Sequence, residues 1–247
     1  MHERGLNIIK GVVLFLFASF LAEKVLTGKI YNYIGPRFIW TAALAILIFL
    51  VMAFSYLRAN PEQEEHGAEH THAHVHKHTL SKGSLFFGAL LLFFGLVIPA
   101  RPLGVSQVTN QGISTDVSAP DVDLQSSLTI VPAERNILDW VRAIGTDPDP
   151  AALNGQTADV VGFVYRDVRF GADQFMVTRF SVACCVADAR ALGLVVEMTG
   201  ASQYSTGAWV RVTGIFREGR LDNLPIPVIQ AQQITRVEQP MQPYLYP

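Results

Sequence analysis

The chain contains little charge for its length. Only 16% of its 247 residues are charged, whereas soluble domains carry roughly 25%. Nearly all of the long apolar runs lie in residues 1–100, and residues 101–247 read as an ordinary globular sequence. The low charge therefore predicts that the first part of the chain lies in lipid and that the second part is a domain in water.

Lysine and histidine are absent from the second part, residues 101–247. Residues 101–247 contain eleven Arg, no Lys and fifteen Asp or Glu, which gives a formal net charge of −4. Because non-specific binding to nucleic acid requires a basic surface, we exclude nucleic acid as a partner. No histidine follows His78, and we find no Ser/His/Asp constellation and no phosphate-binding glycine loop. We therefore expect the protein not to be an enzyme.

Cysteine is scarce, and the two cysteines, Cys184 and Cys185, are neighbours. An ordinary disulfide needs α-carbons about 4.4 to 6.8 Å apart, whereas neighbouring α-carbons lie about 3.8 Å apart. This spacing excludes an ordinary disulfide between them and leaves a strained vicinal disulfide as the alternative. The cysteine content consequently says little about the redox compartment.

Three apolar segments are predicted to cross a membrane. Residues 38–57 carry no charge and match the ~20 residues that span a ~30 Å hydrocarbon core. Residues 83–100 form a second uncharged run. Residues 6–26 form the third segment, with Lys10 near one end and Glu23 and Lys24 near the other, where long side chains can reach the interface.

A cleaved signal peptide is the alternative for the first segment, although no small-residue cleavage motif ends it. If the chain has three spans, a short loop around residues 30–37 connects the first two spans. The basic residues flanking the spans favour a cytoplasmic N-terminus and a C-terminal domain outside the cytoplasm. We therefore predict a multi-pass protein of the bacterial cell (inner or plasma) membrane.

The loop 58–82 between the second and third spans contains six of the seven histidines. These are His66, His70, His72, His74, His76 and His78. In an extended strand one side would carry His70, His72, His74, His76 and His78, and in a helix one face would carry His66, His70, His74 and His78. Either backbone lets several imidazoles bind one divalent transition metal ion, although the spacing matches no structural zinc fold. The alternatives are a polar loop without specific function and a pH-responsive patch.

The C-terminal part is predicted to be a small β domain with one preceding helix. Residues 102–131 read as an extended linker, and the domain follows in residues 132–247. Residues 132–145 have the apolar spacing of an amphipathic helix that Gly145 can end, and we interpret Trp140 as a packing residue.

Five short strands are predicted after this helix, at 158–166, 174–183, 191–198, 207–216 and 226–237. Five strands in so short a stretch favour a small OB-like barrel, with a β-sandwich as the alternative. Gly162 and Gly214 fit bends or bulges that let a short sheet close. The fold class is thus an α+β membrane protein, with three transmembrane helices followed by an OB-like β-barrel.

The two cysteines follow the second predicted strand. If that strand continues regularly, Cys184 lies on its more apolar face with Phe180 and Val182, and the two thiols diverge. A bulge or turn at residues 186–188 is then needed for both thiols to reach one ion. Two interpretations stay open: buried small apolar residues, or a metal or redox site that includes Asp188.

The chain resembles the bacterial YcgQ-like membrane proteins, which are described as permease subunits. The resemblance covers essentially the whole chain and is carried by GFVYRD, RFSVACCVADA, WVRVTG, IPVI and PYLYP, at 162–167, 179–189, 209–214, 226–229 and 243–247. It implies a multi-spanning permease as partner and a link to divalent metal homeostasis, zinc above all. It also implies that Cys184 and Cys185 matter, without giving either a role.

Three functions follow as expectations. The first is a non-catalytic subunit in the lipid bilayer that assists a permease in zinc or other divalent metal transport. Its metal-binding residues are the six histidines with Cys184, Cys185 and Asp188. The second is a membrane-tethered OB-like module that binds a protein or polymer. The third is a thiol redox protein that uses Cys184 and Cys185.

Overall fold

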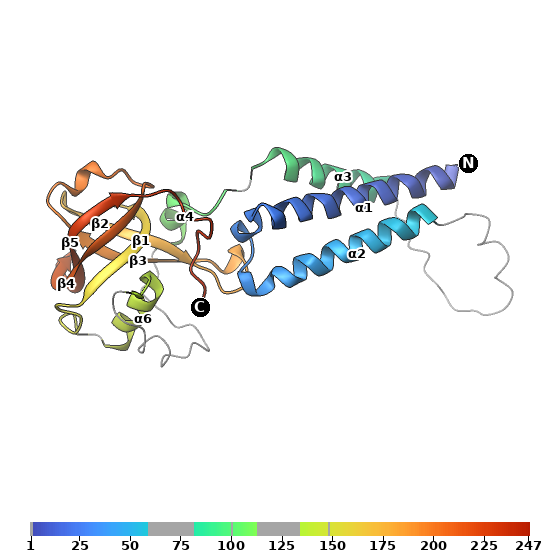
Figure 1. Ribbon diagram of the computed structural model, residues 1–247. Helices are drawn as coiled ribbons and strands as arrows, with labels where there is room; N and C mark the ends of the chain where they lie inside the picture. The colour runs from blue at the N-terminus through green and yellow to red at the C-terminus, as the bar shows by residue number, and fades with distance from the viewer. Residues whose placement is uncertain (1, 59–81, 100, 113–133, 148) are drawn as a thin grey trace, which may run out of the picture. The chain divides into compact units, whose positions relative to one another are not determined.

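The computed structural model describes residues 2–58, 82–99, 101–112, 134–147 and 149–247. The chain divides into two compact units (Figure 1). The first unit comprises residues 1–30 and 36–101, and the second comprises residues 31–35 and 102–247. The short link 31–35 joins two helices of the first unit along the chain but belongs to the second unit.

The first unit contains the three predicted apolar segments as helices. Helix α1 spans His2–Leu26, helix α2 spans Ile39–Arg58 and helix α3 spans Lys82–Val97. The helical stretches Arg4–Leu26 and Pro36–Arg58 are long and apolar enough to cross a membrane. Helix α3 is equally apolar but has 16 residues, so it is shorter than the ~20 residues of a typical span.

Small residues bring the three helices together. A Cβ added at Gly11 of α1 would lie 3.0 Å from Leu57 Cγ near the end of α2, so these two helices pack closely and run antiparallel. A Cβ at Gly95 of α3 would lie 3.1 Å from the ring of Phe20 of α1. Close packing at small residues is typical of membrane helices, because lipid provides no hydrophobic drive for their association.

The outer surfaces of these helices are aliphatic and aromatic. Trp40 and Phe54 on α2 are 63% and 55% exposed, and Phe86 and Leu96 on α3 are 71% and 65% exposed. Contiguous apolar patches of this kind are rare on soluble proteins and mark a surface covered by lipid or by another protein.

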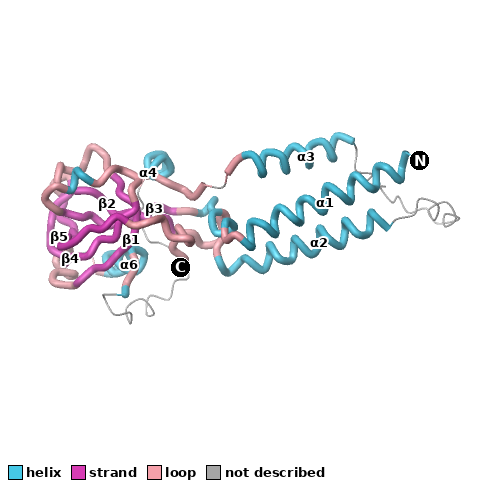
Figure 2. Tube along the Cα trace, turned by 45° about the horizontal axis from the view of Figure 1, so that its top comes forward, coloured by secondary structure: helices cyan, strands magenta, loops and turns pink. Residues whose placement is uncertain are grey.

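The second unit contains five strands, which run as β1 (Thr157–Tyr165), β2 (Gln174–Ser181), β3 (Arg190–Glu197), β4 (Trp209–Leu221) and β5 (Leu224–Arg236). They form one mixed sheet (Figure 2). Of its strand pairs, only β3–β5 is parallel. The strand order β1-β2-β3-β5-β4 closes on itself, because β1 pairs with both β2 and β4. The five predicted strands are confirmed, and the single sheet shows that the sandwich alternative is wrong.

An apolar core fills the inside of this sheet and extends to helix α6 (Ile137–Thr146). The helix begins at Ile137 because Asn136 caps it: Asn136 Oδ1 accepts the Leu138 N–H at 2.8 Å, and Asp139 Oδ2 accepts the Asn136 N–H at 3.0 Å. Such a cap contributes about 1 kcal/mol. Trp140 is fully buried, with its ring centroid 4.6 Å from that of Phe216, which confirms that it is a packing residue.

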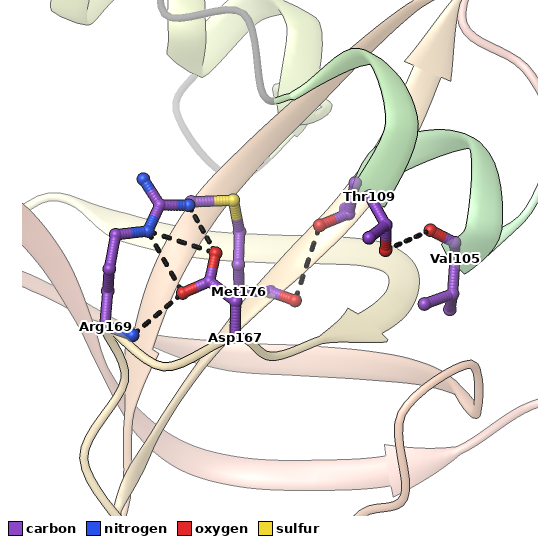
Figure 3. A network of polar contacts seen from close by, with 6 residues as sticks. Val105, Thr109, Asp167, Arg169 and Met176 are labelled. Carbon is purple, nitrogen blue, oxygen red and sulfur yellow. Dashed lines mark hydrogen bonds and ion pairs between the residues drawn. The ribbon is translucent and has the colours of Figure 1, made fainter.

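A second apolar cluster covers part of the outside of the sheet. Helix α4 (Val105–Gln111), which lies inside the predicted linker, contributes Val108 to it, and the C-terminal tail contributes Tyr244. The strands contribute Phe163, Met176 and Phe180 among others. Figure 3 shows Met176 between α4 and the β1–β2 loop, where the Arg169 guanidinium pairs with the Asp167 carboxylate.

The two glycines predicted at bends serve different purposes. The β4–β5 register shifts between Thr213 and Gly214, so the predicted bulge at Gly214 is confirmed. The β1–β4 register is continuous through Gly162, so no bulge lies there. A Cβ at Gly162 would instead lie 2.6 Å from the Thr178 carbonyl oxygen and 3.1 Å from Ile137 Cδ1, so this glycine permits a close approach inside the core.

We predict that Gly214→Ala destabilises the β domain by about 1 to 3 kcal/mol. The added Cβ would clash with the Gln230 carbonyl oxygen and lie 2.8 Å from Ala231 Cα, both of them backbone atoms that cannot rotate away. Urea unfolding of the detergent-solubilised chain, followed by tryptophan fluorescence, measures the change.

Gly145→Ala is the matched control. Its Cβ would meet nothing within 4 Å, and the residue lies in a helix, so we expect a gain of at most about 1 kcal/mol. Equal unfolding midpoints for Gly214→Ala and the unchanged protein would contradict the steric role of the bulge.

Candidate functional site

Three of the predicted metal-binding residues meet in the second unit. Cys184, Cys185 and Asp188 each offer one ligand atom, and these atoms all lie within 4.8 Å of one another. We call this group the thiol site. The other predicted ligands, His66, His70, His72, His74, His76 and His78, lie outside the described residues.

A turn rather than a continued strand carries the two cysteines. Strand β2 ends at Ser181, and a short 3-10 turn follows at Val186–Asp188. Cys184 is exposed and Cys185 is half-buried. The regular-strand alternative, with Cys184 on an apolar face, is therefore wrong. Both thiols can reach one ion only if the chain turns after the cysteines. The predicted turn at 186–188 is present.

The Asp188 carboxylate organises this turn. Its Oδ1 accepts the Ala183 N–H at 2.8 Å, and its Oδ2 accepts the N–H groups of Cys184 and Cys185 at 2.8 and 3.1 Å. Burial raises the pKa of Asp188, but hydrogen bonds from the Cys184 thiol and from these three N–H groups outweigh it and hold that pKa below its usual value. The carboxylate is thus ionised and fixed, and it folds the backbone so that both thiols point to one place.

The two thiols form a close pair. Cys184 Sγ lies 3.6 Å from Cys185 Sγ. The hydrogen bond from the Cys184 thiol to Asp188, followed by the contact with Cys185, raises the pKa of Cys184 to about 11. At neutral pH this thiol therefore keeps its proton, and its reactivity toward electrophiles is low.

The link 31–35 holds the turn from one side. Gly35 N–H donates to the Cys184 carbonyl oxygen at 2.9 Å, and Val186 N–H donates to the Tyr33 carbonyl oxygen at 2.9 Å. These bonds place Ile34 opposite Cys185 in an antiparallel bridge. The sequence did not predict this pairing, since five residues between two apolar segments carry no strand pattern.

The C-terminal tail supports the end of β2 next to the turn. Val182 N–H donates to the Leu245 carbonyl oxygen at 2.9 Å, and Leu245 N–H donates to the Phe180 carbonyl oxygen at 2.8 Å. The Tyr244 hydroxyl accepts the Leu103 N–H at 3.0 Å and donates to the Asn32 carbonyl oxygen at 3.3 Å, which joins the tail to the link. In the sequence, the aromatic segment PYLYP at 243–247 is the feature that indicates this packing.

The thiol site offers two sulfur donors and one oxygen donor. Thiolates bind zinc and other thiophilic ions, and a carboxylate oxygen can complete such a ligand set. Three of the roughly four lone-pair directions of Asp188 are used by N–H groups, and the remaining one accepts the Cys184 thiol proton. An ion that displaces this proton would free that direction for coordination.

The chain therefore combines two apolar helices that can span a membrane with a β domain that carries two paired thiols. It belongs to the DUF1980 family: the C-terminal domain of this family matches residues 108–247, and its N-terminal domain matches residues 9–114. This membership agrees with the resemblance read from the sequence motifs.

Two relatives carry names. A protein of Streptococcus mutans serotype c is named "Putative two-component membrane permease complex subunit"; it is 24% identical over 263 aligned positions, which cover 90% of this chain and 92% of the relative. The "UPF0703 protein YcgQ" of Bacillus subtilis is 24% identical over 99 positions, which cover 39% of this chain and 35% of the relative. No solved structure matches the chain significantly.

We predict that Asp188→Asn makes Cys184 react faster with a maleimide in metal-free protein. The pKa of the thiol is about 11 with the carboxylate present and should fall toward the ordinary value of 9.0 without it. At pH 9 the thiolate fraction, and with it the rate, should rise by about tenfold or more. Tandem mass spectrometry can assign the modification to Cys184 rather than Cys185.

Asp167→Asn is the control, because the Asp167 carboxylate pairs with Arg169 instead of a thiol. We expect this variant to leave the Cys184 rate unchanged. Circular dichroism should show that Asp188→Asn stays folded. An unaltered rate in folded Asp188→Asn would refute the control of the thiol by the carboxylate.

Proposed function

We propose that this protein is a non-catalytic subunit of a two-component permease in the bacterial plasma membrane, and that its β domain holds a divalent transition metal, zinc first, at the thiol site. The convergence of Cys184, Cys185 and Asp188 carries the proposal: three donors of the right chemistry lie within 4.8 Å of one another at an accessible turn. The proposed role is to receive the ion and pass it to the permease.

The relative's name and the helix surfaces support a membrane partner. The Streptococcus mutans relative is named as one subunit of a two-component membrane permease complex, and it aligns over most of both chains. Three helices are too few to enclose a transport path. Among the described residues of α1, α2 and α3, the one buried charge is Lys10, which lies near the start of α1 and stacks on Tyr56, 5.4 Å from the ring centroid.

We propose that α3 is the third transmembrane span. Its 16 helical residues are followed by Ile98 and Pro99, which continue the apolar stretch. Phe86, Phe87 and Phe93 are each more than half exposed, a surface that lipid would solvate and water would not. With three spans, a cytoplasmic N-terminus gives a C-terminal domain outside the cytoplasm.

The β domain is proposed to be OB-like. A closed five-stranded order β1-β2-β3-β5-β4 with a parallel β3–β5 pair supports this. OB-folds bind oligonucleotides and oligosaccharides on the face of their second and third strands. Here helix α4 and the C-terminal tail bury the outward side chains of that region, Met176 and Phe180 among them. The covered face makes a polymer-binding module the weaker alternative.

Metal binding is better supported than thiol redox chemistry. The sulfur–sulfur distance of 3.6 Å suits a dithiol that becomes a disulfide. However, thiol–disulfide exchange requires a thiolate nucleophile, and Asp188 keeps the pKa of Cys184 near 11. A metal ion needs no free thiolate beforehand, because its charge displaces the proton on binding.

We predict that the chain lacking residues 66–78 still binds one Zn²⁺ or Co²⁺ per molecule at the thiol site. The cobalt form should show sulfur-to-metal charge-transfer absorption. Cys184→Ser with Cys185→Ser should abolish both the binding and the absorption. Because binding releases thiol protons, the affinity should rise with pH below the thiol pKa.

Asp167→Asn again serves as the matched carboxylate control and should bind metal normally, whereas Asp188→Asn should bind more weakly. Retained stoichiometry in the double serine variant would rule out the thiol site. Comparing the intact chain with the chain that lacks 66–78 measures what the histidines add.

Isolation of the tagged chain from its native membranes should co-enrich a multi-spanning membrane protein in near-equal amount. Quantitative mass spectrometry measures the ratio, and an unrelated tagged membrane protein of similar abundance is the control. Recovery of the chain alone under mild detergent, with the β domain folded, would argue against the two-component assembly.

A further inference from the structure

We infer that the thiol site lies on the same face of the membrane as the link between α1 and α2, and that the end of α2 at Arg58 lies on the opposite face. This inference rests on the proposed membrane location, but not on metal binding or on a permease partner. Two independent sets of contacts support it, one within each unit.

The first set fixes the link to the β domain. Residues 31–35 belong to the same compact unit as residues 102–247. The backbone bonds of Gly35 and Val186, both 2.9 Å, and the Tyr244–Asn32 bond, 3.3 Å, hold the link on the cysteine turn and the tail. A bilayer cannot separate two backbone segments that are hydrogen-bonded to each other. The link and the thiol site therefore share one aqueous face.

The number of crossings then follows from connectivity. The chain leaves the link at Gly35, passes through α2 and α3, and returns to the same unit at Pro102. A path that starts and ends on one face of a bilayer crosses it an even number of times. Since α2 is one crossing, α3 has to be the second. This requirement favours three spans over two, even though α3 is the shortest of the three helices.

The second set of contacts gives the direction of α3. Cβ atoms added at Gly88 and Gly95 of α3 would lie 3.9 Å from Phe17 and 3.1 Å from Phe20 of α1. The later glycine of α3 contacts the later phenylalanine of α1, so α3 runs parallel to α1. Gly11 of α1 packs on Leu57 of α2, so α2 runs antiparallel to α1. The C-terminal ends of α1 and α3 therefore point to the same face, as the link requires.

The end of α2 and the start of α3 consequently lie across the bilayer from the thiol site. Arg58 and Lys82 end α2 and begin α3, on the face opposite to Cys184. The histidines His66 to His78 lie between them in sequence.

Cysteine labelling in sealed membranes tests the inference with four single-cysteine variants of the full chain. They carry Arg37→Cys, Arg58→Cys, Arg101→Cys or Val168→Cys in a background of Cys184→Ser and Cys185→Ser. All four positions are exposed. A membrane-impermeant maleimide should label positions 37, 101 and 168 from one face and position 58 from the other, with at least a tenfold difference between faces. Permeabilised membranes should label all four equally.

The unchanged protein provides a reading that needs no substitution, because Cys184 is exposed and at pH 9 should label, slowly, from the same face as position 37. If the protein is membrane-bound but positions 58 and 168 label from the same face, the proposed sidedness is wrong and the membrane location stands. The same holds if positions 37 and 168 label from opposite faces. Equal labelling of all positions in sealed membranes, with the chain in the aqueous fraction, would overturn both this inference and the membrane location.

Discussion

The thiol site depends on one carboxylate that accepts three backbone N–H groups. Without the Asp188 side chain, the N–H groups of residues 183 to 185 would lack partners where the chain leaves β2. With it, the backbone turns and the neighbouring cysteines, which an extended strand would point apart, face the same way. The same carboxylate keeps the Cys184 thiol protonated, so shape and chemistry have a common origin.

Much of the fold could be predicted because it is encoded locally. The five strands follow from apolar alternation, and their observed ends lie within a few residues of the predicted ones. The apolar segments follow from length and lack of charge. Gly214 was predicted at a bulge because a glycine inside a strand pattern often marks one. Gly162 has the same pattern but permits close packing instead. Helix α6 starts at Ile137, several residues after the predicted start at residue 132, because Asn136 supplies the cap.

The environment of the site could not be predicted in the same way. The pairing of residues 31–35 with residues 184–186 joins segments about 150 positions apart through backbone atoms, and backbone atoms leave no mark in the side-chain pattern. Helix α4 was predicted as linker because its seven polar-rich residues show little periodicity; its single buried anchor, Val108, is too little to reveal an amphipathic helix. Both features involve tertiary contacts that only the folded chain defines.

The closed order of the β domain also limits how another protein can attach to it. Each of the five described strands has two strand neighbours over at least part of its length, so the sheet offers no free edge along its paired length. Partners that bind by adding a strand need such an edge. Assembly with this domain consequently relies on turns, loops and side-chain surfaces, and copies of the domain cannot join edge to edge along their paired strands.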